Sequence, residues 1–272
     1  KYKFIIFNTL RIKNGDILMD SIFDSDEFNR NLFFPRLDYS KTPNGAEDFF
    51  ISVESSCKIH VRTFRSLTAK FSILFFHGNG EIISDYNSIA ESFMQLGCDF
   101  TVCDYRGYGK SEGIPSLKTT LNDASAIYCF LKKNAILNKK VCVMGRSIGS
   151  APALDLCKYF SEITCCVIES GYADPIPLVK RRGLKISSIT REENALYNNS
   201  EKIRLIKCPI FIMHGEVDTL ISPEEAKLNY KNVSSQIKIL KILKGVGHND
   251  MLMAPNNSYF NSLSSFFAQV VL

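Results

Sequence analysis

A serine flanked by glycines stands where a short apolar run gives way to a helix-like segment. The residues are Gly145-Arg146-Ser147-Ile148-Gly149, preceded by the apolar run 141–144 and followed by the helical pattern 150–160. In such a strand-turn-helix unit the serine occupies a strained turn that lifts its hydroxyl above the sheet edge, and the glycines let strand and helix approach closely. A plain turn rich in small residues would look the same, so the rest of the chain must decide between the two interpretations.

The composition allows one large α/β domain and argues against nucleic-acid binding. Of the 272 residues, 45% are hydrophobic, which suffices for a sizeable core. The 33 basic and 28 acidic residues are interleaved and give a net charge of +5. The densest basic run, 180–182 with Lys185 just beyond, lacks the aromatic residues and motifs of nucleic-acid-binding proteins, so we expect a solvated face there.

Cysteine usage and the lengths of the apolar runs bear on location. The nine cysteines are odd in number and form no C-x-x-C pair, which predicts reduced thiols. No apolar run reaches the length of a membrane span, and the patch at 4–7 is too short for a signal-peptide core. We therefore expect a cytoplasmic protein without stable membrane insertion. Because the chain begins with Lys1 and not with Met, this expectation leaves open a targeting segment before it.

Strand-like and helix-like segments alternate along most of the chain. The predicted strands are 48–53, 58–64, 71–76, 100–103, 141–144, 163–168, 209–213 and 236–243, and the predicted helices are 84–96, 117–134, 150–160, one that starts near Ser222-Pro223, and 253–271. This alternation predicts a mostly parallel, twisted sheet of about eight strands with helices on both faces. The first two strands are predicted to form an antiparallel hairpin at the edge of the sheet.

Two regions are expected to lie outside this regular pattern. Residues 1–45 have no clear period and predict an N-terminal arm that packs on the domain formed by 46–272. The connection of roughly 40 residues after the sixth strand is longer than usual, which predicts a small inserted cap at about 171–207.

A serine nucleophile requires a base, usually a histidine that a carboxylate orients. The chain has four histidines. His60 lies inside an early edge strand, and His77 and His214 each precede a glycine directly after a buried strand, where the ring more often holds loop backbone. Only His248, in the loop between the last strand and the last helix, is placed to reach Ser147.

The expected carboxylate is Asp218, in the loop after the seventh predicted strand. The order Ser147, Asp218, His248 places all three at carboxyl ends of strands, where open α/β sheets bind their ligands. Glu216 comes too soon after its strand, but Glu169, directly after the sixth strand, is a serious rival to Asp218. This constellation favours the nucleophile interpretation of Ser147 over the plain turn.

The developing oxyanion of an acyl-transfer reaction also requires N–H donors that are already in place. The backbone N–H of Ile148, which follows the serine, is one candidate. The backbone N–H of Asn79, in the loop His77-Gly78-Asn79-Gly80, is the other. The alternative for this loop is a glycine turn without contact to substrate.

Three loop motifs resemble those of a known family. His77-Gly78-Asn79 follows the third strand, Asp104-Tyr105-Arg106-Gly107-Tyr108-Gly109 the fourth, and Gly247-His248-Asn249-Asp250 the last. From about residue 46 to the C-terminus the chain resembles the α/β-hydrolase superfamily, and within it the small-cap serine hydrolases, which include protein depalmitoylases, lipases and many bacterial members of unknown substrate. The resemblance implies the α/β-hydrolase fold and hydrolysis through an acyl-serine intermediate. Arg146 stands where many relatives carry histidine.

The sequence thus predicts a serine hydrolase that cleaves a carboxylic ester or thioester of a small-molecule or acylated substrate through an acyl-Ser147 intermediate. An acyltransferase or serine peptidase with the same triad, and a hydrolase-fold binding protein without turnover, are the alternatives. In the cap, Leu178 and Leu184 are predicted either to line the acyl site or to pack the cap onto the domain. Neither a metal-ligand cluster such as H-E-x-x-H nor a cofactor motif occurs, so we expect no metal and no cofactor.

Overall fold

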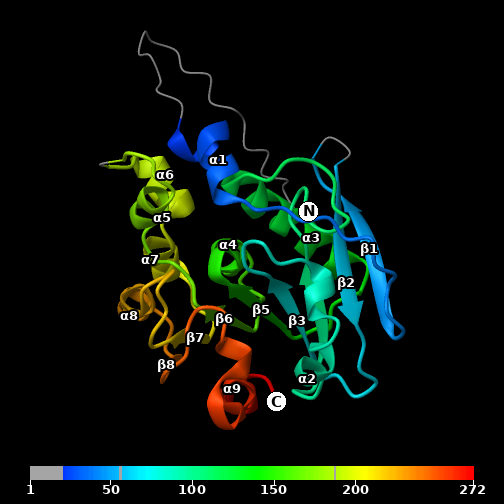
Figure 1. Ribbon diagram of the computed structural model, residues 1–272. Helices are drawn as coiled ribbons and strands as arrows, with labels where there is room; N and C mark the ends of the chain where they lie inside the picture. The colour runs from blue at the N-terminus through cyan, green and yellow to red at the C-terminus, as the bar shows by residue number, and fades with distance from the viewer. Residues whose placement is uncertain (1–20, 55–56, 187) are drawn as a thin grey trace.

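In the computed structural model, which describes residues 21–54, 57–186 and 188–272, eight strands form one twisted sheet with helices on both sides (Figure 1). The strand order is β1-β2-β4-β3-β5-β6-β7-β8. The β1–β2 and β2–β4 pairs are antiparallel, and the other five pairs are parallel. This architecture confirms the predicted mostly parallel sheet with a hairpin at its edge.

The strands run over β1 (Ala46–Ser52), β2 (Lys58–Phe64), β3 (Phe71–Phe76), β4 (Cys98–Cys103), β5 (Val141–Arg146), β6 (Cys165–Glu169), β7 (Ile210–Gly215) and β8 (Lys238–Leu243). The α-helices are α1 (Asp26–Leu32), α2 (Ala90–Met94), α3 (Leu117–Lys133), α4 (Ser150–Tyr159), α5 (Pro175–Arg181), α6 (Arg191–Tyr197), α7 (Asn199–Lys202), α8 (Pro223–Asn232) and α9 (Ser258–Val270). As predicted, Ser222 caps α8, since its side chain accepts a hydrogen bond from Glu224 N–H and Pro223 occupies the first helical position.

The two faces of the sheet carry separate apolar cores. Along β3, Leu74 and Phe76 join the core shared with α1, α3 and α4, whereas Ile73 and Phe75 join the core shared with α2 and α9. Successive side chains of a strand point to opposite faces, so a strand covered on both sides must be apolar throughout. This explains why the central strands appear in the sequence as unbroken hydrophobic runs.

Two predicted helices are shorter in the structure than the sequence pattern indicated. The prediction of a helix over 84–96 was wrong in its first half, because the chain forms a 3-10 turn at Ile83–Tyr86 before α2 begins at Ala90. The carboxylate of Asp85 accepts the Ile82 N–H at 3.0 Å, which stabilises a tight turn in place of a longer helix.

The last helix begins at Ser258 and not at Met253. Pro255 lacks an N–H and holds the residue before it, Ala254, in an extended conformation, and Asn256 and Asn257 then adopt φ values of 56° and 53°. A continuous helix cannot pass through these left-handed residues.

Pro152, in contrast, is tolerated in α4. The helix starts at Ser150, so the missing N–H of Pro152 falls among the first four N–H groups, which have no partner within a helix.

The described part of the arm packs against the region predicted to be the cap. Phe23 and Phe28 are fully buried, and the Phe23 ring lies 4.6 Å from the Tyr197 ring of α6. Tyr197 Oη also donates to Asp24 at 3.3 Å. Figure 1 shows α1 beside α5 and α6 at one end of the molecule. Residues 1–20, including the apolar patch at 4–7, lie outside the described residues.

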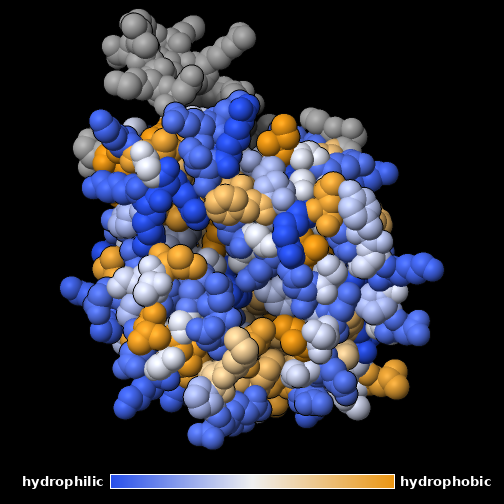
Figure 2. All heavy atoms as spheres, viewed as in Figure 1, coloured by the Kyte–Doolittle hydropathy of each residue, from blue (hydrophilic) through white to orange (hydrophobic). Residues whose placement is uncertain are grey.

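The described residues bear on two further predictions. The nine cysteines are all free thiols, as predicted, and the five that lie in strands are buried (Cys98, Cys103, Cys142, Cys165 and Cys166). In the described ranges, no helix is both long and apolar enough to cross a membrane. Apolar and polar residues alternate over the face seen in Figure 2.

Candidate active site

Ser147 occupies a strained turn directly after β5. Its φ of 54° lies in the left-handed region, which residues with a β-carbon seldom adopt. A Cβ built on Gly145 would lie 2.2 Å from Gly149 O, and one built on Gly149 would lie 2.1 Å from Phe76 O. Both glycines are therefore required for the close approach of β3, β5 and α4. The strained strand-turn-helix geometry that the sequence predicted at Ser147 is present.

Ser147, His248 and Asp218 form one continuous chain of hydrogen bonds. Ser147 Oγ lies 3.1 Å from His248 Nε2, and His248 Nδ1 lies 2.6 Å from Asp218 Oδ2. The three residues follow β5, β8 and β7, whose carboxyl ends meet at one edge because these strands are parallel. Each is less than one-tenth exposed. With Nδ1–H donated to the carboxylate, Nε2 is free to accept the serine proton.

The surroundings of Asp218 keep it ionised. Its Oδ1 accepts the N–H groups of Leu220 and Ile221 at 2.9 and 2.8 Å, and its Oδ2 lies 3.1 Å from His214 Nε2. Burial acts to raise the pKa of Asp218, but hydrogen bonds from His214, His248 and Ile221 outweigh burial and hold that pKa well below its ordinary value. Asp218 is thus a charged acceptor for His248.

The rival carboxylates are engaged elsewhere. Glu169 Oε2 accepts the hydroxyl of Tyr259 at 2.6 Å, and Glu169 Oε1 lies 3.3 Å from Arg146 Nε. Burial raises the pKa of Glu169, against the opposing effects of Arg146 and Tyr259. Glu216 accepts the backbone N–H of Gly245 at 3.0 Å. The geometry therefore agrees with the choice of Asp218.

The other three histidines are fully buried and hold backbone or neighbouring carboxylates. His60 Nδ1 and His77 Nε2 each lie 3.2 Å from a carboxylate oxygen of Asp104. His77 Nδ1 is also 2.8 Å from Gly78 O, and His214 Nε2 donates to Ile221 O at 2.8 Å. His77 and His214 thus hold loop backbone, as expected. The placement of His60 in an edge strand was wrong, because β2 pairs with β1 on one side and β4 on the other.

Asn79 links the loop after β3 to the arm through its side chain. Its Oδ1 accepts the N–H of Phe34 at 3.0 Å and the hydroxyl of Tyr108 at 2.7 Å, and its Nδ2 donates to Leu32 O. This side-chain contact could not be predicted from the sequence, because nothing in residues 1–45 indicates where the arm lies. Ile148 is in the first helical turn after β5, where backbone N–H groups have no intrahelical acceptor.

Comparisons with known proteins identify the family of the chain. A family model described as serine aminopeptidase S33 (Hydrolase_4) matches residues 68–177. The chain is 30% identical over 205 residues to protein bem46 of Schizosaccharomyces pombe, a match that covers 73% of this chain and 67% of the relative. The chain belongs to the α/β-hydrolase superfamily. This α/β hydrolase is also 27% identical over 212 residues to human α/β hydrolase domain-containing protein 17B, with 75% and 68% covered.

Solved structures show the same fold. The Pyrococcus furiosus esterase Pf2001 superposes on this α/β hydrolase with a TM-score of 0.73 and 22% identity, over 88% of this chain and 100% of that one. A monoacylglycerol lipase from Paleococcus ferrophilus superposes with a TM-score of 0.61 and 16% identity, over 78% and 98%. The predicted α/β-hydrolase fold is confirmed.

The two leucines in the predicted cap of this α/β hydrolase pack against its apolar core. Leu178, in α5, is 6% exposed within the apolar core that also includes Tyr172 and Tyr197, and Leu184 is partly buried against the same core. These contacts hold the stretch that includes α5 against the domain, and both the cap and a role of the leucines in acyl binding stay predictions.

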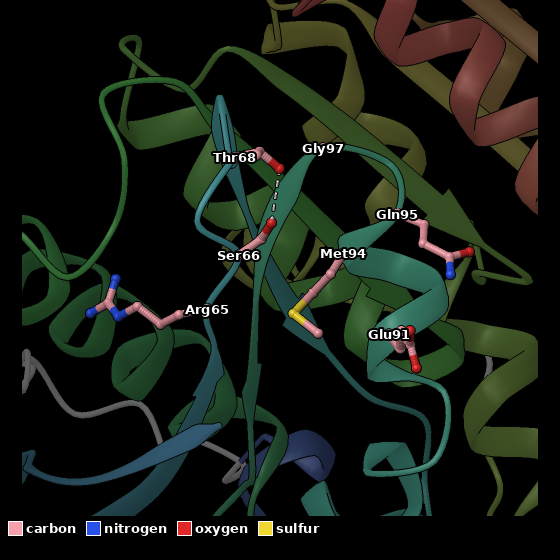
Figure 3. A pocket seen from close by; sticks show the side chains of 7 residues that line it. All are labelled: Arg65, Ser66, Thr68, Glu91, Met94, Gln95 and Gly97. Carbon is pink, nitrogen blue, oxygen red and sulfur yellow. Dashed lines mark hydrogen bonds between the residues drawn. The ribbon is translucent and has the colours of Figure 1, made fainter. Parts of the chain in front are cut away.

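A surface hollow lies far from the candidate site. Its lining residues, drawn in Figure 3, are Arg65, Ser66, Thr68, Glu91, Met94, Gln95 and Gly97. They follow β2 or precede β4, whereas Ser147 follows β5. The hollow is therefore at the amino-terminal edge of the parallel strands, opposite Ser147, and we assign no chemistry to it.

Proposed function

We propose that this α/β hydrolase is a serine hydrolase that cleaves carboxylic esters or thioesters through an acyl-Ser147 intermediate. The observation that carries the proposal is the Asp218–His248–Ser147 hydrogen-bond chain, with spacings of 2.6 and 3.1 Å. A binding protein without turnover has no need for an ionised carboxylate, an oriented imidazole and a strained serine at one edge of its sheet.

The reaction would proceed in two half-reactions. His248 Nε2 accepts the Ser147 proton while Ser147 Oγ attacks the acyl carbon, and the resulting oxyanion receives hydrogen bonds from the backbone N–H groups of Ile148 and Asn79. His248 then protonates the departing alcohol or thiol. In the second half-reaction His248 removes a proton from water, the hydroxide adds to the acyl carbon, and Ser147 regains its proton as the carboxylic acid leaves. The Asp218 carboxylate stabilises the imidazolium that forms in each half-reaction.

The comparisons support ester cleavage more than the alternatives. Pf2001 is named an esterase and the Paleococcus ferrophilus protein a monoacylglycerol lipase. The matching family model is described as a serine aminopeptidase, and a peptidase or an acyltransferase would use the same triad. These reactions differ in the leaving group or the acceptor, so they are outcomes of the test below.

A fluorophosphonate probe followed by a substrate panel tests the proposal. Folded protein should be labelled at Ser147, with the modified peptide identified by mass spectrometry, and heat-denatured protein should not. The panel contains p-nitrophenyl esters and acyl thioesters of graded chain length together with aminoacyl anilides. Absence of labelling at Ser147 in folded protein would sink the serine-hydrolase proposal, and a preference for anilides would assign a peptidase.

The rate should depend on pH through His248. Only neutral imidazole can accept the serine proton, so kcat/KM for a short ester should fall as the pH drops and His248 becomes protonated. The pKa of Asp218 is held well below its ordinary value, so Asp218 stays ionised across this range and does not add a second limb. A pH profile of kcat/KM from about pH 5 to 9 measures this. An acid limb that persists unchanged in an active His248 variant contradicts the assignment.

We also propose that the cap, at about 171–207, contributes to chain-length selection, with Leu178 and Leu184 as the predicted acyl contacts. Leu184→Phe should lower the rate with long-chain esters relative to the acetyl ester by roughly tenfold, because the larger ring shortens the acyl site. Leu205→Phe is the matched control, since Leu205 is 58% exposed in the turn after α7. Rates along a series of p-nitrophenyl esters give the profile. Leu205→Phe should keep the wild-type profile. If Leu184→Phe keeps it as well, Leu184 only packs the cap onto the domain.

The location of the protein remains a proposal as well. The nine free thiols are what a reducing compartment preserves, which supports the cytoplasm. Labelling of the thiols in intact cells, compared with labelling after lysis, tests it.

A further inference from the structure

We propose that Arg146 is a positioning residue for this reaction: it connects the loop of His248 and the loop of Asn79 to the nucleophile, and it supplies the positive charge beside His248. The inference rests on the proposed function. Arg146 is the last residue of β5, directly before Ser147, and its side chain is 10% exposed. A charged side chain buried this far requires partners for its donors.

The first set of partners lies in the histidine loop. Arg146 Nη2 donates to the backbone carbonyl of His248 at 3.1 Å and to Oδ1 of Asn249 at 3.2 Å. The hydrogen bond to the carbonyl fixes the main chain of the residue whose ring must stay 3.1 Å from Ser147 Oγ. Arg146 therefore connects the base to the strand that carries the nucleophile.

The second set leads to the oxyanion loop. Arg146 Nε lies 3.2 Å from Glu81 Oε1, and the other oxygen of Glu81 accepts the Gly78 N–H at 2.7 Å and the Tyr86 hydroxyl at 2.6 Å. A Cβ on Gly78 would lie 2.9 Å from Glu81 Oε1 and 3.1 Å from Arg146 Nη1, so both side chains pack closely against the main chain of Gly78. Gly78 directly precedes Asn79, so the position of the Asn79 N–H depends on this contact.

The third partner is Glu169, at the end of β6. Its Oε1 lies 3.3 Å from Arg146 Nε, and its Oε2 holds Tyr259 of α9. One guanidinium thus contacts the last residue of β6 and groups in the loops after β3 and β8. Only arginine has several N–H donors in a rigid planar fork, whereas the ammonium of lysine is a single point charge.

The charges around His248 predict how its titration responds to Arg146. The ring of His248 contacts the carboxylate of Asp218, which follows β7, and His214 in β7 lies against the same carboxylate. Arg146, at the end of β5, contacts the His248 carbonyl and pairs with Glu169 of β6 and with Glu81, which follows β3. Asp250 lies on the loop of His248 itself. Removing the guanidinium takes away a positive charge that lies against the main chain of His248. Loss of a nearby positive charge favours imidazolium, so the acid limb of kcat/KM should move to higher pH.

Two substitutions separate charge from geometry. Arg146→Gln should lower kcat for a short ester about a hundredfold with KM within about twofold, because the base and the oxyanion donors lose alignment, and should move the acid limb up by about half a pH unit. Arg146→Lys should lower kcat comparably but leave the acid limb in place, because the charge remains. The control is Arg106→Lys, since Arg106 is a part-buried arginine that pairs with both oxygens of Asp123 at 2.8 Å. It should change neither quantity.

Rescue and labelling complete the test. Millimolar guanidinium should restore part of kcat in Arg146→Ala, whereas urea at the same concentration should not. The inference is overturned if Arg146→Gln keeps the wild-type kcat and acid limb. Should Arg146→Gln fail to fold, Arg146→Lys decides the question, and a wild-type kcat in it overturns the inference. An unlabelled Ser147 in the wild-type protein instead overturns the proposed function, so the two failures are distinguishable.

Discussion

Ser147→Ala should lower kcat for an ester substrate by about 10⁶-fold while the fold persists. The reaction loses its nucleophile, and a residual rate some thousandfold above that in water should remain from the oxyanion donors and substrate binding. Alanine can occupy the turn because serine already places a β-carbon at φ 54°. The loss is the largest that we expect from any single substitution.

The measurement combines ester hydrolysis, fluorophosphonate labelling and a thermal melt. Ser147→Ala should lose labelling and turnover together and keep a melting temperature close to that of the wild type. Ser92→Ala, a serine replacement in α2 away from the catalytic edge, should keep all three properties. Near-wild-type turnover by folded Ser147→Ala would refute the nucleophile assignment.

Asp218→Asn should lower kcat by about 10⁴-fold. An asparagine amide at this position can donate to His248 Nδ1, which places the ring proton on Nε2 and removes the acceptor for the serine hydroxyl. The loss of charge also removes stabilisation of the imidazolium. Hydrolysis of a short ester by stopped and continuous assays at neutral pH measures the loss, and labelling by the fluorophosphonate should slow in parallel.

Glu169→Gln is the matched comparison for Asp218→Asn. Glu169 is fully buried at the neighbouring strand end, but it contacts Tyr259 and Arg146, whereas Asp218 contacts His248 at 2.6 Å. Its replacement should therefore lower kcat within about tenfold, an indirect effect through Arg146. A larger loss in Glu169→Gln than in Asp218→Asn would transfer the role of the orienting carboxylate to Glu169.

Local patterns in the sequence were sufficient to predict most of the regular structure. Some signals depend only on residues that are close in the sequence, so they can be interpreted without the fold. They are the unbroken apolar runs of β3, β5, β6 and β7, the glycines around Ser147, and the helix start at Ser222-Pro223. The positions of Ser147, Asp218 and His248 after three predicted parallel strands also predicted that they would lie close together, because the carboxyl ends of parallel strands meet at one edge. The predicted helix 84–96 shows where local patterns fail. The helix begins only at Ala90, because Asp85 stabilises a 3-10 turn that the apolar period did not reveal.

The tertiary structure decided the contacts between segments far apart in the sequence. Asp218 and Glu169 each follow a buried strand, and only the positions of the folded loops bring one of them to His248. The arm reaches Asn79 across 45 residues of sequence, and Arg146 reaches the His248 carbonyl across 102. Such pairs carry no periodic signal, because their hydrogen bonds depend on how the sheet aligns its strand ends. The sequence alone determined which residues follow the carboxyl ends of the parallel strands, and the fold determined which of them are in contact.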